Sequence, residues 1–120
     1  MKKRLWKIIF AILFLCAFSL NSSAAIFTED GTIGPGYNEP TEIKNLATVN
    51  MIGGNSNDVW IRDYGVLNFS SGTILHTRVE NVGTMNLLGS SLENIELHNS
   101  AKFNVKGGLF EGHIAAWIQV

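Results

Sequence analysis

The chain has 120 residues, of which 46% are hydrophobic and only 16% are charged. Nine Lys and Arg face ten Asp and Glu, so the chain lacks the basic excess that a sequence-independent nucleic-acid binder needs. A single Cys excludes a disulfide scaffold and a Cys-rich zinc module, and the high apolar content excludes a disordered polar chain.

The first 24 residues have the pattern of an export signal. A basic start precedes an apolar run over 8–20 and a polar stretch that ends in Ala24-Ala25, which is the order of a signal peptide with a small-residue cleavage site. A transmembrane anchor is the alternative, but the apolar run extends only about 20 Å, short of the ~30 Å hydrocarbon core. We therefore predict a cleavable signal peptide over 1–24 and a protein that is secreted or held at the cell surface.

Cys16 raises a second alternative, a lipid-modified cysteine. The residue before it is Leu15, where the lipoprotein motif requires a small side chain, and the apolar run continues beyond it. We therefore expect Cys16 to be removed with the signal peptide, together with four of the nine basic residues. The mature chain is then acidic, because 9 − 4 = 5 basic residues face all 10 acidic ones and give a net charge of −5.

Residues 25–46 lie between the signal and the first repeat. Gly34-Pro35-Gly36 and Pro40 interrupt this segment, and such residues favour turns over regular strands. We predict an N-terminal cap or irregular leader over 25–46, with Ile43 and Leu46 packed against the first coil.

From residue 47 onward the sequence repeats four times with a period of 18. Each copy begins with an apolar-Asn-apolar triplet, followed by a pair of Gly or Ser residues. A period of two indicates a strand with its apolar side chains on one face and Asn on the other, and the Gly and Ser pairs suit a corner. The Asn column is Asn50, Asn68, Asn86 and Asn104, between the apolar columns Val49, Leu67, Met85, Phe103 and Met51, Phe69, Leu87, Val105.

A second pair of columns lies further along each repeat, again two residues apart, and predicts a second strand with inward apolar side chains. Each repeat closes with Asp or Asn before a Gly or Ala, which predicts a second turn. The two columns are Val59, Thr77, Ile95, His113 and Ile61, Val79, Leu97, Ala115.

An 18-residue unit of short strands cannot bury its apolar face alone, but stacked coils with parallel strands about 4.8 Å apart bury all of these faces together. The sequence therefore predicts an all-β fold, a short parallel β-helix (β-solenoid) of about four coils. A left-handed helix of hexapeptides also takes 18 residues per coil, but the position six residues after the Val49 column is mostly polar. We therefore favour a right-handed β-helix. The predicted coils are 47–64, 65–82, 83–100 and 101–118.

The apolar-Asn-apolar-x-Gly-Gly blocks resemble the tandem repeats of secreted bacterial right-handed β-helix proteins of the autotransporter-passenger and sorting-signal exoprotein types. The resemblance covers residues 47–118 and implies a surface or secreted protein with an adhesive role. The C-terminal anchoring segments of such proteins do not follow the fourth repeat. We therefore expect this chain to be a truncated protein or a fragment.

The Asn column has two interpretations. Stacked Asn side chains form hydrogen-bonded amide ladders in cross-β assemblies, and they can also form a recognition surface for glycans. We favour the structural ladder, because a residue present in every coil usually serves the coil. Trp60 and Tyr64 are the candidate glycan contacts, since aromatic rings stack on sugars and Trp60 lies between two inward positions.

We predict no metal site and no cofactor. His76, His98 and His113 occupy three different repeat positions, so we do not expect them to gather around one point as metal ligands must. Asp58 and Asp63 are the only aspartates in the repeats, which is too few for the several oxygen ligands that calcium needs.

A polysaccharide lyase or hydrolase is the alternative function, because such enzymes share the β-helix architecture. Outward charges on a solenoid are usually only solvated, and a fold alone does not supply a function. We therefore predict a structural or adhesive solenoid without catalytic activity. The cluster that a lyase would use is Asp58, Arg62, Asp63, Arg78 and Glu80.

Surface glycans or matrix are the expected partners, with no nucleic acid and no membrane span once the signal is removed. End-to-end self-association is also expected. The fourth coil would leave an unpaired strand edge, with Phe110 and Ile118 lacking a polar cap.

Overall fold

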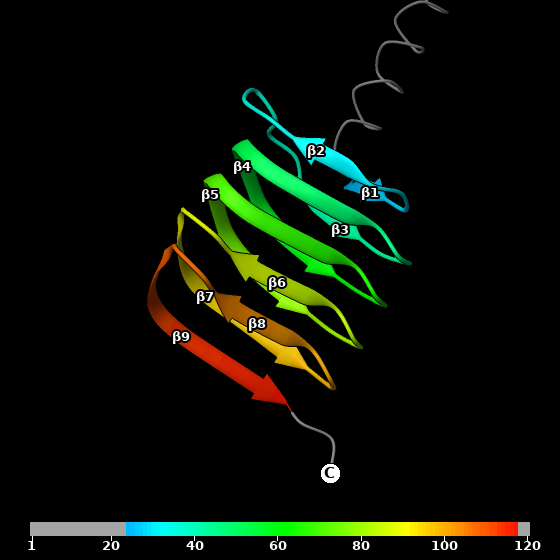
Figure 1. The fold of residues 1–120 in the computed structure, drawn as a ribbon, viewed down its shortest axis with the longest axis vertical. Coiled ribbons are helices and arrows are strands. Elements are labelled where there is room, and N and C mark those ends of the chain that lie inside the picture. The colour runs from blue at the N-terminus through cyan, green and yellow to red at the C-terminus, as the bar shows by residue number, and fades with distance from the viewer. Residues whose placement is uncertain (1–23, 118–120) are drawn as a thin grey trace, which may run out of the picture.

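A computed structural model describes residues 24–117, and they form a parallel β-solenoid of about five turns (Figure 1). This confirms the predicted all-β class and the 18-residue coil. Residues 1–23 of the predicted signal peptide and Ile118 lie outside the described residues. The strands are β1 (Ala25–Phe27), β2 (Gly31–Ile33), β3 (Thr41–Ile43), β4 (Thr48–Ile61), β5 (Val66–Val79), β6 (Thr84–Leu87), β7 (Ser91–His98), β8 (Lys102–Val105) and β9 (Leu109–Trp117).

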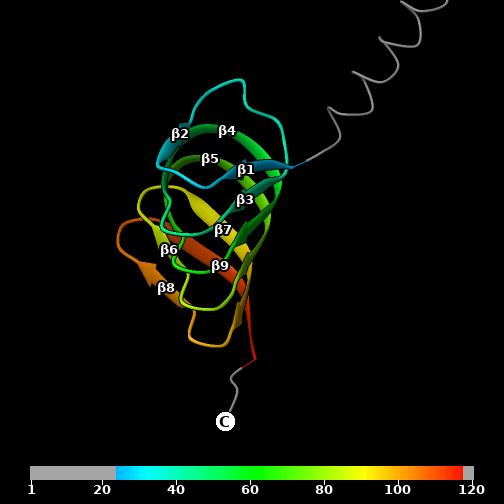
Figure 2. The same cartoon turned by 90° about the vertical axis from the view of Figure 1, so that its right-hand side faces the viewer.

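All strand pairs are parallel, and the triplets pair in the predicted register. β4 pairs with β5, β5 with β6 and β6 with β8, so that each Asn stands beside the Asn 18 residues away. The chain winds around a common interior, coil after coil (Figure 2). A one-residue slip would turn every apolar side chain to the outside, so burial of these columns fixes the register.

Two outward faces result from this winding. The Asn face consists of β2, the first parts of β4 and β5, and then β6 and β8. The Trp60 face consists of β1, β3, the second parts of β4 and β5, and then β7 and β9. The two long strands β4 and β5 turn the corner between the faces, at Gly54 (φ 83°) and Gly72 (φ 115°).

The interior between the two faces holds most of the predicted apolar columns. The prediction is wrong for Val105, which is 52% exposed because no described strand pairs with the outer edge of β8. Thr77 belongs to the Val59 column and is also fully buried, as its position in the repeat predicts. The core residues that are at most 1% exposed include Val49, Met51, Val59, Ile61, Leu67, Phe69, Val79, Met85, Leu87 and Ile95.

Each of the first four coils ends in a left-handed residue, and in the repeats this residue lies at the predicted second turn. A short polar side chain that bonds locally lets Asn and Asp adopt this conformation. After each of the last three corners, the backbone N–H of the next residue donates to the corner carbonyl of the preceding coil, as from Tyr64 to Asn45 at 2.9 Å. These corners are Asn45, Asp63, Asn81 and Asn99, with φ between 54° and 61°.

Residues 25–46 differ from a simple cap or irregular leader, because they contain strands that stack like the repeats. Both β2 and β3 pair with β4 at an offset of 18, which adds one coil to the four predicted. Ile43 is buried as expected. The expectation for Leu46 is wrong: it is 76% exposed, because it lies in the turn after β3 and not at an inward strand position.

The last described coil departs from the 18-residue register. β7 and β9 pair at an offset of 18 up to Phe110 and at an offset of 19 beyond it. Gly112 lies within this irregularity, where a Cβ atom would clash with the carbonyl oxygen of Glu93. A glycine there allows the close approach of the two backbones and the insertion of one extra residue.

The extra residue makes two of the predicted inward positions wrong. His113 pairs with Asn94 and not with Ile95, and Ala115 likewise leaves the predicted column. Ile114 and Ala116 take these two columns instead. Ile114 is still 52% exposed, since no described coil stacks on the outer side of β9.

Candidate functional site

One outward column runs through the middle of the Trp60 face. Because the strands are parallel and about 4.8 Å apart, the side chains of this column stand next to one another along the solenoid. The column contains an aromatic ring and a guanidinium group with a carboxylate at each end. In order of pairing it is Glu42, Trp60, Arg78 and Glu96.

Arg62 holds one side of this column in place. Its guanidinium group bonds Glu42 at 3.1 Å and Glu80 at 2.8 Å, and its Cζ atom lies 4.5 Å from the centre of the Trp60 ring. The hydrogen bond to Glu42 is the main reason that the pKa of Arg62 is raised above its ordinary value. Arg62 is therefore a charged positioning group whose two strongest contacts are with carboxylates of this chain.

Arg78 also approaches the Trp60 ring. Its Cζ atom lies 5.6 Å from the ring centre, and its Nε lies 3.7 Å from the Glu96 carboxylate and donates to His98 Nε2 at 3.3 Å. The His98 ring stacks on Trp117 of β9 with centroids 4.6 Å apart. Only Nε of Arg78 has a hydrogen-bond partner among the described residues.

Asp58 and His76 form a pair beside this column. The His76 Nδ1 atom lies 3.5 Å from Asp58 Oδ1, and its Nε2 atom lies 3.6 Å from Glu96 Oε2. The imidazole therefore bridges two carboxylates that lie on β4 and β7, on either side of its own strand. The Asp58 side chain is 71% exposed, so its second oxygen is open to a ligand.

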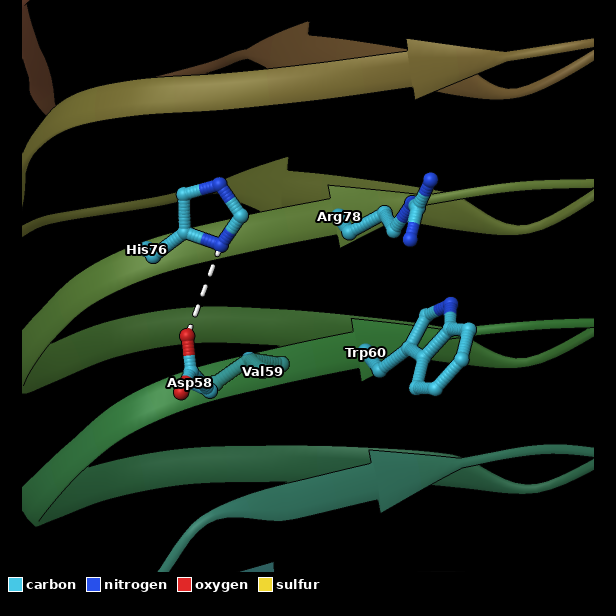
Figure 3. A pocket seen from close by; sticks show the side chains of 5 residues that line it. All are labelled: Asp58, Val59, Trp60, His76 and Arg78. Carbon is cyan, nitrogen blue, oxygen red and sulfur yellow. Dashed lines mark ion pairs between the residues drawn. The ribbon is translucent and has the colours of Figure 1, made fainter.

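These groups border an open pocket of about 270 Å³ (Figure 3). Figure 3 shows Asp58 and His76 at one end of it and Trp60 and Arg78 at the other. Trp60 is 36% exposed, whereas Val59 is buried. The pocket thus combines an apolar ring with a carboxylate acceptor, an imidazole and guanidinium donors.

The expectation that the histidines stay apart is wrong for two of them. His76 and His98 both approach Glu96 Oε2, at 3.6 and 3.9 Å. They occupy different columns, but on one outward face, and diagonal neighbours on adjacent strands are within reach of long side chains. Arg78 lies beside the same carboxylate, and no cluster of three His, Cys, Asp or Glu side chains within residues 24–117 has the geometry to hold a metal ion.

The Asn column forms a ladder on the opposite face. Asn68, Asn86 and Asn104 each donate a side-chain amide hydrogen bond of 2.9 Å to the Asn of the preceding coil, beginning at Asn50. The amide groups therefore bind one another along the stack. Tyr64 is 62% exposed in the turn after β4 and does not line the pocket.

The five residues of the proposed lyase cluster do not form one site. Asp63 occupies a corner, where its carboxylate accepts bonds from the Asn45 backbone N–H at 3.2 Å and the Asn81 amide at 3.3 Å. Arg62 and Glu80 pair with each other, and only Asp58 and Arg78 line the pocket. The sequence did not single out Glu96, although its place in the column of Trp60 was a usable signal.

The chain matches no protein-family model, and comparisons with curated proteins and with solved structures find no match either. Residues 24–117 contain no helix with the length and apolar character needed to cross a membrane.

Proposed function

We propose that this chain is an exported β-solenoid with a structural or adhesive role, and that it binds glycans through the Trp60 face without catalysing a reaction. One observation carries the proposal: a partly exposed Trp60 lies in a pocket that is also lined by the hydrogen-bonding side chains of Asp58, His76 and Arg78. Binding sites commonly combine apolar surface with a few polar groups that fix orientation. The stacked coils support it further by holding these groups on strands, which position side chains rigidly.

The aromatic ring of Trp60 supplies the contact area in this proposal. Exchange of Trp60 for alanine is expected to weaken glycan binding by about tenfold or more, since buried aromatic contacts dominate recognition sites. Exchange of Tyr64 for alanine is the matched control, because it removes an exposed aromatic ring outside the pocket. Glycan-array binding and calorimetry check both variants. Equal losses of glycan affinity in the two variants would contradict the proposal that the pocket binds the glycan.

Export is the second part of the proposal, supported by the basic start and apolar run of residues 1–24 and by the resemblance of the repeats to those of surface exoproteins. Expression in a bacterium with a functional secretion pathway is expected to give a product that begins at Ala25. Intact-mass measurement of the extracellular protein checks this. A product that retains Lys2, or one that carries a lipid on Cys16, would overturn it.

A carbohydrate-active β-helix enzyme is the second candidate, and the position of His76 between Asp58 and Glu96 favours it. An imidazole oriented by a carboxylate is a common general base. Incubation with polysaccharides separates the two functions. New reducing ends or unsaturated products that disappear in His76→Gln would establish the enzyme and reject the binding module.

A further inference from the structure

We infer that the pocket on the Trp60 face takes an uncharged sugar ring and rejects the corresponding acidic sugar. This inference rests on the proposed function and adds the chemical class of the ligand to it. The balance of charge around the pocket and the supply of hydrogen-bond donors and acceptors within it lead to the same class.

Carboxylates outnumber guanidinium groups in the network of ion pairs around the pocket. The two cations are Arg62 and Arg78, and with neutral histidines the formal sum is 2 − 4 = −2. Arg62 is held by two carboxylates at 2.8 and 3.1 Å, so it offers little to an incoming anion. The four anions are Glu42, Asp58, Glu80 and Glu96.

The rest of the described chain does not offset this excess. All ten acidic residues but only five of the nine basic ones follow residue 24, which gives residues 25–120 a formal charge of 5 − 10 = −5. A polyanionic ligand would therefore meet repulsion both in the pocket and during its approach. An uncharged ligand meets no such repulsion, either in the pocket or during its approach.

The polar groups of the pocket suit hydroxyls better than carboxylates. A hydroxyl donates one hydrogen bond and accepts others, so neighbouring sugar hydroxyls can donate to Asp58 and accept from the terminal nitrogens of Arg78. A ligand carboxylate only accepts, and it would compete with Glu96, which lies 3.7 Å from Arg78 Nε. The C–H face of the same sugar ring would lie on Trp60, which stands with Arg78 at the end of the pocket away from Asp58 (Figure 3).

Matched oligosaccharides test this inference directly. Oligomers of galactose and of galacturonate, with the same length and linkage, differ only in carrying CH₂OH or a carboxylate on each ring, and glucose and glucuronate oligomers form a second pair. Calorimetric titration of the full chain at low salt is expected to show at least about tenfold tighter binding of the neutral member in at least one pair. The difference in affinity between the neutral and the acidic member is expected to shrink as the salt concentration is raised, because salt screens exposed charges.

Two variants test whether the carboxylates around the pocket cause this preference for the neutral sugar. Each of the two variants, Asp58→Asn and Glu96→Gln, removes one negative charge. Both are expected to reduce the ratio of affinities for the neutral and acidic members several-fold. The control Tyr64→Ser is expected to leave this ratio unchanged. Tighter binding of the acidic member, still lost in Trp60→Ala, would overturn the inference and leave the proposed function standing. Absence of binding to every member of both pairs would overturn the inference and, with a negative glycan array, the proposed function as well.

Discussion

Exchange of Leu67 for aspartate is expected to abolish cooperative folding of the solenoid. Leu67 is fully buried and pairs with Val49 on one side and Met85 on the other. An unpaired carboxylate at this position costs several kcal/mol, a large part of the total stability of about 5–15 kcal/mol that is usual for a domain. Urea unfolding followed by circular dichroism measures the effect.

The neighbouring Asn68 provides the matched control, because the same new residue then points outward. Asn68→Asp loses the amide that donates to Asn50 but keeps an oxygen that accepts from Asn86, so the expected cost is only about 1 kcal/mol. Similar destabilisation in both variants would show that the inward and outward columns have been assigned incorrectly.

The second large effect is expected at the corner between the two faces. Gly72 has a φ of 115°, and a Cβ atom there would lie 2.6 Å from the Gly54 carbonyl oxygen and 2.9 Å from Met51 Cε. Gly72→Ala is therefore expected to lower the free energy of unfolding by about 2–4 kcal/mol, because it adds backbone strain to a contact that cannot relax easily.

Gly34 offers the control for this change, since a Cβ atom built on it meets nothing within 4 Å. Gly34→Ala is expected to change the free energy of unfolding by less than about 0.5 kcal/mol, measured in the same urea titration. If both alanine variants were equally stable, the close approach of coils at Gly72 would not exist in solution.

The stacking of the coils was predictable from the sequence because one periodic pattern set it. An Asn between two apolar residues recurs every 18 positions, and only a parallel stack buries all of the apolar columns at once. Thr77 shows how strong the pattern is, since its alignment with Val59 and Ile95 predicted a buried position for a polar residue, and its side chain is fully buried.

The two ends of the solenoid were not predictable in the same way. The first coil carries Thr32 where the repeats carry Asn. The apolar-Asn-apolar triplet therefore does not reveal this coil in the sequence, although the backbone of the coil pairs with the next one as in the repeats. In the last coil the shift at Gly112 depends on how closely two backbones approach. An alignment of the 18-residue repeats alone does not reveal such a contact.

The candidate site was predictable only in part, because it is made of outward side chains. Alternation placed Trp60 outside, which singled it out as a glycan contact. The alternation of inward and outward residues could not show which long side chains contact one another, because these contacts depend on the rotamers of residues on neighbouring coils. His76 and His98 therefore seemed unrelated in the sequence, although both approach Glu96.

The most direct test of the account is a nuclear magnetic resonance titration of ¹⁵N-labelled protein with a neutral oligosaccharide. The indole N–H of Trp60 and the Nε–H of Arg78 are expected to shift with one common affinity, while the side-chain amides of Asn50, Asn68 and Asn86 stay in place. Shifts confined to those ladder amides, with Trp60 unmoved, would contradict the account and place glycan recognition on the Asn face.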